Sequence, residues 1–513
     1  MAGGLSGADD AQARAAGAPA RGRAPGRRAG WHGRLGLAGG GVRAQAMTAQ
    51  GGSWRGDIRR WIETTGARVH LMGVGGIGMA GVARLLAAKG QRVTGCDSGN
   101  PRTMGWLRAC GIPAATGHAA AHLEDVDWAV FSPALPPGHP ERVAAEARGI
   151  PSYRRGQVLP VLAEQWKTVA VSGTHGKTTT SSMIAHGLRV GGADPSWCIG
   201  GELPPDGAPA GVGNSEWLVI EADESDGTLA HYFPEVAVIT NIEFDHMEHF
   251  ASPDAMVDCF RAFARQARGA VVFCADDPEA ARIGAAAKGV SYGFHGNADF
   301  SAEILEVGPS GTAFAVRAPG GRAASVVLPL PGRHNVLNAL GALAACDRCG
   351  IALENACAAL GSFSLPKRRF EPVAEARGIR IIADYAHHPS EIRALIAAAK
   401  QAGASRIWAV FQPHRHTRTL ALGADFPPAF DGVAGVILAP VYAASEPPMA
   451  GGTADDLLKH FQKHAGAPAE LANHLGEAAE LVAARWKSGD WVLVVGAGDV
   501  EDVGPMLKKK LET

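Results

Sequence analysis

The sequence has almost no net charge and no long apolar run. Its 49 Lys and Arg and 50 Asp and Glu residues give a formal net charge of −1 over 513 residues. This balance lacks the basic excess of a nucleic-acid binder, so we expect small-molecule partners and no nucleic acid. No stretch approaches the ~18 apolar residues of a membrane-spanning helix, and the first residues lack a secretory signal's apolar core. We therefore expect a cytoplasmic protein with no membrane partner.

Cysteine is also scarce. Eight cysteines are scattered along the chain, a usage that predicts reduced, mostly buried thiols rather than a disulfide framework. Cys346 and Cys349 form the one CxxC pair. A structural zinc site would need a second pair of ligands nearby. Because no such pair is evident, we interpret these two cysteines as structural.

The first 46 residues lack apolar periodicity and are rich in Gly, Ala and Arg. Such a segment cannot bury enough surface to offset chain entropy, so disorder is predicted. Its Arg content suggests a transit peptide, but Ser is scarce, and Met47 is an alternative translation start. We treat residues 1–66 as an extension and lead-in. The rest is too long for one core, which stops growing at roughly 250–300 residues, and fits about three domains.

Short apolar strands alternate with helical stretches along the rest of the chain, which predicts parallel sheets covered by helices. The predicted strands are 69–72, 91–96, 128–131, 168–172, 217–221, 236–240, the isoleucines around 381, 408–411, 436–438 and 491–495. Residues 298–330 differ, because alternating strands flank Pro319-Gly-Gly321 and indicate antiparallel hairpins. The expected fold class is α/β with an antiparallel appendage.

A phosphate-binding loop is the clearest chemical signal. The string Gly173-Thr-His-Gly-Lys-Thr-Thr-Thr180 follows an apolar strand and opens a helix. Backbone N–H groups of such a loop cradle phosphates, while Lys supplies a point charge and Thr a magnesium ligand. Lys177 and Thr178 fill these roles, although Val171 stands where the longer motif has its first Gly. ATP and Mg²⁺ are therefore the expected ligands.

Acidic segments follow the next two predicted strands. Glu221–Asp226 and Asn241–His246 stand at strand ends that should converge on the phosphate loop. Their carboxylates would complete the coordination of magnesium, which prefers oxygen ligands.

A second glycine-rich turn precedes these motifs. Gly73-Val-Gly-Gly-Ile-Gly78 satisfies GxGxxG, and Asp97 ends the following strand. By spacing alone this is a dinucleotide fingerprint, and an NAD-dependent dehydrogenase is one interpretation. Physically the turn indicates only that a phosphate-bearing nucleotide approaches the backbone.

A reaction that couples two phosphate-bearing ligands accounts for both turns. In a ligation, ATP activates a carboxylate on a nucleotide-linked substrate, and an amine attacks the acyl phosphate. Cations must stabilise the migrating phosphoryl group and the tetrahedral intermediate. The candidates lie in the last third of the chain, in Lys367–Arg369, His387-His388 and His414–Arg418.

These residues carry a resemblance to the murein peptide ligase family over about residues 66 to 505. The motifs, in order, are His70–Met79, Ser172–Thr180, Glu221–Asp226, Asp245–Met247, Pro331–Asn338, Arg368–Phe370, Asp384–Pro389, Phe411–Thr419, Val441–Ala444 and Gly496–Asp499. The resemblance implies an ATP-dependent ligase of cytoplasmic peptidoglycan precursor synthesis. It implies three substrates, UDP-N-acetylmuramate, L-alanine and ATP, and reassigns the GxGxxG turn from NAD to the UDP diphosphate.

The resemblance also implies three α/β domains. A Rossmann-like UDP-sugar-binding domain would span residues 67–165, and a central P-loop-type ATPase domain with the antiparallel appendage 166–364. A C-terminal Rossmann-like domain that binds the amino acid would span 365–513. We expect a monomer or a weak homodimer.

Carried over by motif, the resemblance implies roles for individual residues. The ATP-binding residues are Gly173, Thr174, His175, Gly176, Lys177, Thr178, Thr179, His334, Asn335, Arg369 and Asp384. The UDP-sugar would contact Gly73, Gly75, Gly76, Ile77, Gly78, Met79 and Asp97. The metal ligands are Thr178, Glu221 and His246, the amino-acid contacts Tyr385 and His388, and the catalytic residues Lys177, His388, Arg415 and Arg418.

Three positions depart from the family pattern, all near the expected amino-acid pocket: Ala386 and Ser445 replace Gly, and His416 replaces Tyr. The nearest rival function is that of the family's tripeptide-recycling ligase. The string Gln412–Arg418 and the closing Gly496–Asp499 favour alanine addition. An NAD oxidoreductase would not explain the second nucleotide loop. A non-catalytic binding module would be expected to lack some of the magnesium ligands, whereas the sequence indicates a complete set.

Overall fold

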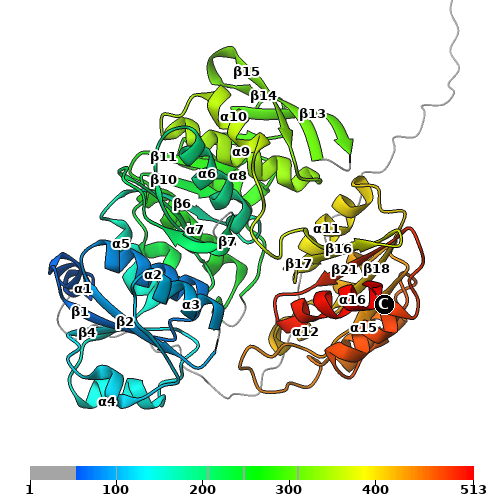
Figure 1. Ribbon diagram of the computed structural model, residues 1–513. Coiled ribbons are helices and arrows are strands. Elements are labelled where there is room, and N and C mark those ends of the chain that lie inside the picture. The colour runs from blue at the N-terminus through cyan, green and yellow to red at the C-terminus, as the bar shows by residue number, and fades with distance from the viewer. Residues whose placement is uncertain (1–53, 100, 205–206, 247–248, 309–310, 513) are drawn as a thin grey trace, which may run out of the picture. The chain divides into compact units, whose positions relative to one another are not determined.

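The computed structural model describes residues 54–99, 101–204, 207–246, 249–308 and 311–512. The predicted disordered extension and Met47 lie outside these residues. Three sheets flanked by helices follow one another along the chain (Figure 1). They fall within the ranges 67–165, 166–364 and 365–513, so the predicted three-part α/β fold is confirmed, while the boundaries between the parts remain predictions. None of the helices described is long and apolar enough to cross a membrane.

The first sheet has five parallel strands in the order β3-β2-β1-β4-β5. Its strands are β1 (Arg68–Met72), β2 (Arg92–Asp97), β3 (Ala114–Thr116), β4 (Trp128–Phe131) and β5 (Ser152–Arg154). Its helices are α2 (Ile77–Ala88), α3 (Pro101–Ala109), η1 (Ala120–Leu123), α4 (Pro140–Ala147) and α5 (Arg155–Ala163). This is the order of the first five strands of a doubly wound Rossmann sheet, in which ligands bind where the strand order reverses. Here that point lies between β1 and β4.

Helix α1 (Trp54–Glu63) lies in the segment that sequence patterns left as a lead-in. Ile58 and Ile62 bury one face of the helix in the core. Beside them on the same side of the helix, Arg55 and Arg59 form ion pairs with Glu164. The helix is ten residues long, so it depends on this packing rather than on intrinsic propensity.

The central sheet has ten strands in the order β15-β14-β13-β12-β11-β10-β6-β9-β7-β8. The strands are β6 (Lys167–Ser172), β7 (Ser196–Leu203), β8 (Ala208–Gly211), β9 (Trp217–Glu221), β10 (Val236–Ile239), β11 (Ala270–Cys274), β12 (Val290–Gly293), β13 (Phe300–Gly308), β14 (Gly311–Ala318) and β15 (Arg322–Leu328). Strands β13 to β15 pair antiparallel, which confirms the predicted hairpins. They continue the main sheet, because β12 pairs with β13.

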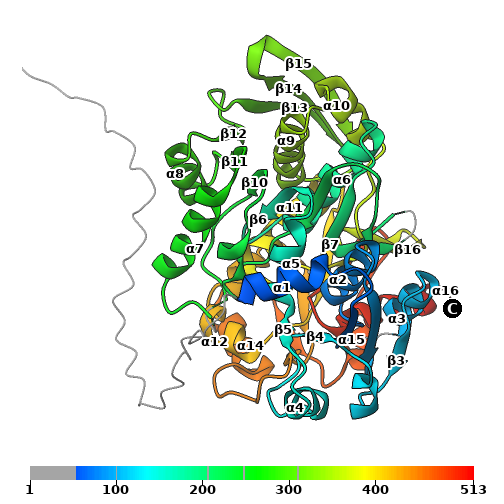
Figure 2. The same ribbon diagram turned by 90° about the vertical axis from the view of Figure 1, so that its left-hand side faces the viewer.

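Helices cover both faces of this central sheet. The helices of this part are α6 (Lys177–Val190), η2 (Thr228–His231), α7 (Pro253–Gln266), α8 (Pro278–Ala286), α9 (Arg333–Arg348) and α10 (Leu353–Gly361), and η3 (Pro319–Gly321) forms the turn between β14 and β15. Val169 and Val171 of β6 face the core formed with α6, α9 and α10, whereas Ala170 between them faces the core that includes α7 and α8. Figure 2 shows α7 and α8 on the opposite side of the strands from α9 and α10. Burial on both faces explains the uninterrupted apolar strands of the sequence.

The third sheet has the order β16-β17-β21-β18-β19-β20, with only β16 antiparallel to its neighbour. Its strands are β16 (Glu371–Ala376), β17 (Ile379–Asp384), β18 (Arg406–Phe411), β19 (Gly435–Leu438), β20 (Ala469–Leu471) and β21 (Asp490–Val495). Its helices are α11 (Pro389–Gln401), α12 (His416–Leu422), α13 (Phe426–Ala429), α14 (Ala454–Lys463), α15 (Leu475–Ala483), η4 (Asp499–Asp502) and α16 (Val503–Glu512). Two separate hydrophobic cores, one on each face, make this a doubly wound unit.

The eight cysteines are unpaired, and six of them are buried. Cys346 of the CxxC pair lies in the core beneath α6, and Cys349 is half-buried.

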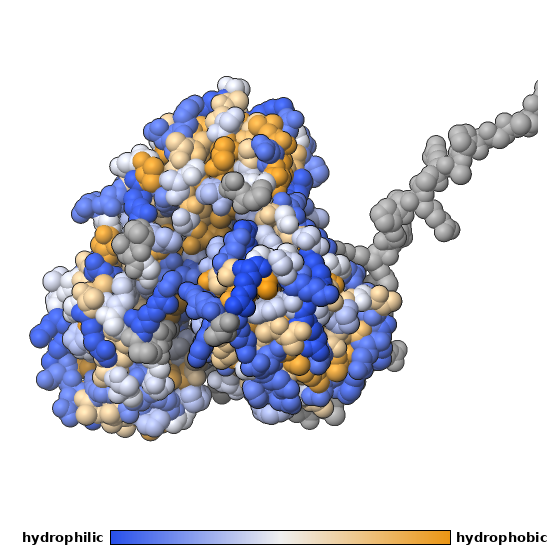
Figure 3. Space-filling model, turned by 45° about the vertical axis from the view of Figure 1, so that its right-hand side comes forward, coloured by the Kyte–Doolittle hydropathy of each residue, from blue (hydrophilic) through white to orange (hydrophobic). Residues whose placement is uncertain are grey.

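On the face shown in Figure 3, hydrophilic side chains predominate and hydrophobic ones occur in small groups.

Candidate active site

The phosphate loop leaves the buried strand β6 through two glycines in left-handed conformations. Gly173 has φ +138°, and a Cβ there would lie 2.0 Å from Thr240 Oγ1. Gly176 has φ +79° and caps α6, whose first residue is Lys177. The loop therefore brings backbone N–H groups to the N-terminus of a helix, where anions are favoured.

Lys177 folds back over this loop. Its Nζ donates to the carbonyl oxygens of Gly173 and Thr174, at 2.6 and 3.2 Å, and to Glu224 Oε1 at 2.8 Å. Burial lowers the pKa of Lys177, but the carboxylates around it, Glu224 foremost, outweigh burial and raise the pKa above its usual value. The ammonium is therefore charged at neutral pH.

The predicted magnesium ligands adjoin this lysine. Thr178 Oγ1 donates to Glu221 Oε2 at 2.9 Å, and His246 Nε2 lies 3.5 Å from Glu224 Oε1. Glu224 is fully buried, and its Oε2 has no hydrogen-bond partner within the described part of the chain. A cation or its water ligand would satisfy that oxygen. Glu224 was not singled out from the sequence, although it stands inside the Glu221–Asp226 motif.

A cavity of about 540 Å³ lies in front of the loop. Residues from all three sheet-bearing parts line it, and most were predicted: Thr174, His175, Gly176, Lys177, Thr178, Glu221, His246, Arg369, Tyr385, Arg415 and Arg418. Asp223, Ser225, Asp226, Asp245, His387 and His414 also line it and lie within the predicted motifs, although no individual role was assigned to them. Pro133, Arg155, His249 and Glu391 were not predicted. The cavity therefore combines the phosphate loop, its carboxylates and the cations of the third part.

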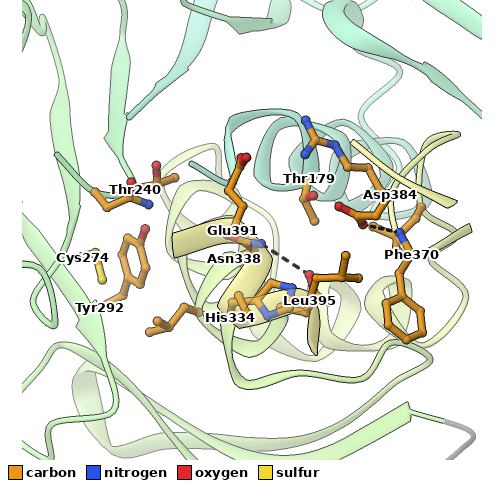
Figure 4. A pocket seen from close by; sticks show the side chains of 17 residues that line it. Thr179, Thr240, Cys274, Tyr292, His334, Asn338, Phe370, Asp384, Glu391 and Leu395 are labelled. Carbon is orange, nitrogen blue, oxygen red and sulfur yellow. Dashed lines mark hydrogen bonds between the residues drawn. The ribbon is translucent and has the colours of Figure 1, made fainter. Parts of the chain in front are cut away.

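A second cavity, of about 140 Å³, lies on the other side of Gly176. It contains the predicted ATP residues Thr179, His334, Asn335, Arg369 and Asp384. Figure 4 shows Asp384 beside Phe370, whose backbone N–H donates to Asp384 Oδ2 at 2.7 Å. Tyr292 and Leu395 add apolar walls, as a nucleoside pocket requires.

Arg418 forms a buried bidentate ion pair with Asp245. Its Nη2 lies 2.9 Å and 3.1 Å from the two carboxylate oxygens, and both side chains are about 5% exposed. Burial opposes ionisation of Asp245, but Arg418 outweighs it and lowers the pKa of Asp245 well below its usual range. Arg415, with φ +70°, caps α12 and contacts Glu446 at 3.3 Å.

His387 and His388 differ in position. His387 lines the larger cavity, and its Nδ1 lies 3.0 Å from the Tyr385 carbonyl oxygen. Burial lowers the pKa of His387 to about 4, so its imidazole is neutral at pH 7. His388 lines neither cavity. It caps α11, and its buried Nε2 has no partner among the residues described.

His175 of the phosphate loop links the central part to the third part. Its Nε2 lies 3.1 Å from Glu243 Oε2, and its Nδ1 lies 3.2 Å from Glu391 Oε1. Ser390 Oγ donates to the same Glu243 at 2.9 Å. Burial lowers the pKa of His175, but Glu391 and Glu243 outweigh burial and raise the pKa to about 9.

The raised pKa of His175 predicts a pH-dependent contribution to stability. A group whose pKa rises from 6.5 to about 9 on folding stabilises the fold fully below pH 6.5. That contribution is lost as pH rises through about 9. We therefore expect the wild type to be more stable than His175→Gln at pH 6.5. This difference in the free energy of unfolding, measured by urea titration, should decline as the pH rises from 6.5 to about 9. A constant difference across this range would contradict the charged His175.

The glycine-rich turn after β1 approaches other groups closely. A Cβ at Gly73, where φ is +80°, would lie 2.8 Å from Ser132 Cβ, and one at Gly75 would lie 2.8 Å from Asp97 Cγ. Asp97 Oδ2 accepts a hydrogen bond from Gly75 N at 2.9 Å. Asp97 thus holds the turn in the structure. The predicted Gly76, Ile77, Gly78 and Met79 line a cavity of about 250 Å³ that also contains Glu221.

Arg155 lies where this third cavity meets the large one, since it lines both. Its Nη2 is 3.4 Å from Asp223 Oδ2, and a Cβ at Gly78 would lie 3.1 Å from its Nη1. No sequence motif marked Arg155. It supplies a cation between the glycine-rich turn and the acidic side of the phosphate loop.

Comparison with known families accounts for nearly the whole described chain. Residues 68–167 match the model "Mur ligase family, catalytic domain", residues 171–346 match "Mur ligase middle domain", and residues 368–498 match "Mur ligase, glutamate ligase domain". The three matched ranges coincide closely with the three sheets.

Individual relatives agree with these matches. A UDP-N-acetylmuramate–L-alanine ligase of Pelotomaculum thermopropionicum is 39% identical and covers 86% of this chain and 97% of its own length. The crystal structure of a UDP-N-acetylmuramate–alanine ligase from Thermotoga maritima has a TM-score of 0.74 at 29% identity, and the match covers 87% of this chain and 99% of that protein. The crystal structure of a murein peptide ligase from Psychrobacter arcticus has a TM-score of 0.65 at 26% identity, and the match again covers 87% of this chain and 99% of that protein. The chain belongs to the Mur ligase family.

Proposed function

We propose that this protein joins L-alanine to the carboxylate of UDP-N-acetylmuramate, with ATP as the phosphoryl donor. The observation that carries this proposal is the 540 Å³ cavity, which brings Lys177 and Thr178 together with Arg415 and Arg418. A ligase needs this combination, because one set of groups holds the triphosphate and the other stabilises charge on the acyl centre. Two relatives that match 86% and 87% of this chain are named for the same reaction.

ATP would bind along the loop, with its phosphates at Lys177 and its nucleoside in the cavity of His334 and Asp384. Thr178, Glu221, Glu224 and His246 would hold Mg²⁺, and the unpartnered oxygen of Glu224 fits such a cation. The ion would neutralise phosphate charge as the phosphoryl group moves.

The reaction would then proceed in two steps. The muramyl carboxylate oxygen attacks the γ-phosphorus, and the bond to the ADP oxygen breaks. The alanine amine next attacks the acyl carbon, the amide bond forms, and phosphate leaves with the acyl oxygen. Arg415 and Arg418 line the cavity in which the tetrahedral intermediate would develop negative charge. Neutral His387, with Nδ1 donating to a carbonyl, has Nε2 available to accept a hydrogen bond from the amine, whose proton passes to solvent.

The substrates would enter from different sides. The UDP diphosphate would lie on the turn Gly73–Gly78 and the start of α2, with Arg155 directing the anionic sugar toward the phosphate loop. The amino acid would contact Tyr385, which lines the large cavity, whereas the other predicted contact, His388, is buried and lines neither cavity. We further propose a cytoplasmic monomer or weak homodimer that engages neither nucleic acid nor membrane.

A substrate-dependence assay tests this function. We expect ADP release to require both UDP-N-acetylmuramate and L-alanine in the presence of Mg²⁺. Replacing alanine by the tripeptide that the recycling ligases use should lower the rate at least about 100-fold, because the motifs Gln412–Arg418 and Gly496–Asp499 favour alanine addition. Faster turnover with the tripeptide would replace this proposal with the recycling function, and ADP release that needs neither acceptor would overturn both.

A further inference from the structure

A second cluster of metal-ligating side chains lies in the first part of the molecule, apart from the residues assigned to catalysis. His70 of β1, Cys96 of β2, His122 of η1 and Glu141 of α4 bring one ligand atom each within 4.8 Å of one another. Cys96 and Glu141 are fully buried, and His70 is 2% exposed. Four donors of the types that bind transition metals are thus gathered from four separate elements.

The distances suit a tetrahedral ion. Cys96 Sγ lies 3.3 Å from His70 Nε2 and 3.2 Å from Glu141 Oε1, which lies 2.8 Å from His122 Nδ1. Bonds of about 2.0 to 2.3 Å to a tetrahedral zinc place neighbouring ligand atoms about 3.3 to 3.7 Å apart. The three contacts would need to lengthen by about 0.2 to 0.6 Å, and all four ligand atoms already lie within 4.8 Å of one another.

Two of the ligands are held in position by further hydrogen bonds. His70 Nδ1 lies 2.9 Å from Thr94 Oγ1, which leaves Nε2 directed at Cys96. Glu141 lies 2.7 Å from His118 Nδ1 through Oε2 and accepts from the Ala119 N–H at 2.9 Å through Oε1. Outer partners of this kind orient metal ligands in proteins.

We propose that His70, Cys96, His122 and Glu141 form a structural zinc site. Thiolate and imidazole donors favour Zn²⁺ over Mg²⁺. On binding, the Cys96 thiol loses its proton to solvent, and its thiolate and the Glu141 carboxylate neutralise the dication. A cavity of about 620 Å³, lined by both His70 and His122, gives the ion a path inward. This site is independent of the proposed ligase reaction.

The site would fix the glycine-rich turn. The backbone oxygen of Cys96 accepts hydrogen bonds from the N–H groups of Gly73 and Val74, at 2.9 and 3.0 Å. Asp97, the next residue, accepts from Gly75 N. An ion that ties Cys96 to η1 and α4 would therefore stabilise the base on which this turn is built.

Cobalt spectroscopy tests this site without any measurement of turnover. Untagged full-length protein, stripped by chelator and kept in excess Mg²⁺, is titrated with Co²⁺ alone. We expect a thiolate-to-cobalt charge-transfer band that saturates at one ion per chain and disappears when Zn²⁺ is added. Absence of this band in the wild type would overturn the proposal, whatever the ligase activity.

Variants identify the thiolate. Cys96→Ser, which is nearly isosteric, should abolish the band, whereas Cys110→Ser should retain it, because Cys110 lines the same cavity but is not in the cluster. His122→Asn should weaken cobalt binding at least about tenfold. A band that survives Cys96→Ser or is lost in Cys110→Ser would show that another thiol binds the ion and would overturn the assignment.

Discussion

Lys177→Ala should lower kcat for ADP release by at least about 100- to 1000-fold, the usual cost of removing one group that stabilises transition-state charge. Lys177 reaches Glu224 and two carbonyl oxygens of the phosphate loop, so its ammonium lies where phosphate oxygens would bind. The variant should still fold. It should be destabilised by about 3 kcal/mol, because the fully buried Glu224 loses its ion partner.

Two further variants separate chemistry from stability. Lys177→Ala combined with Glu224→Gln removes the uncompensated charge and should recover most of the lost stability in urea titrations, without recovering turnover. Lys167→Ala is the matched control, because Lys167 is 51% exposed and forms its ion pair with the similarly exposed Glu216. It should leave kcat unchanged and alter stability by less than about 1 kcal/mol. Near-normal turnover in Lys177→Ala would contradict the assignment of the loop to ATP.

Arg418→Ala should combine a large loss of kcat with a loss of about 3–5 kcal/mol in the free energy of unfolding. Both effects arise from one contact, since Arg418 is 5% exposed, lines the cavity and pairs with Asp245 through two carboxylate contacts. Arg418→Lys keeps the charge but cannot form the bidentate pair. Its kcat and its free energy of unfolding should therefore lie between those of the wild type and of Arg418→Ala.

The control for Arg418 is another arginine–aspartate pair in the same part of the chain. Arg406 contacts Asp490, which is 3% exposed, and neither residue lines the candidate active site. Arg406→Ala should lower the melting temperature and leave kcat unchanged at temperatures where the variant is folded. Equal effects of Arg418→Ala and Arg406→Ala on kcat would show that Arg418 acts only through stability.

The fold was predictable where information is local. The apolar run 128–131 coincides with β4, and 217–221 coincides with β9, because burial on both faces imposes a continuous apolar segment. The hairpins around Pro319 follow from turn chemistry in the same way. Helix α1 was missed, since its stability comes from contacts with residues such as Glu164, more than a hundred positions away.

The site was predictable as separate motifs but not as an arrangement. Arg418 was expected to stabilise charge, yet its partner Asp245 lies 173 positions away and no spacing rule joins them. Arg155 and Glu391 were missed because neither carries a local signature, and each acquires its role from residues on other elements. The zinc-type cluster was missed for a similar reason. The only Cys spacing that suggested a metal was Cys346 and Cys349, whereas the cluster draws single residues from four elements.

The position of Lys177 implies that nucleotide and cation bind cooperatively. In the structure the ammonium of Lys177 donates a hydrogen bond to one carboxylate oxygen of Glu224. A triphosphate that attracts Lys177 away would leave a buried carboxylate uncompensated, whereas a divalent cation arriving alone would be repelled by the ammonium. Each ligand removes the penalty incurred by the other, so each should tighten the other's binding by the same factor. Under the proposed function, the loop would therefore favour the magnesium complex of ATP over free ATP.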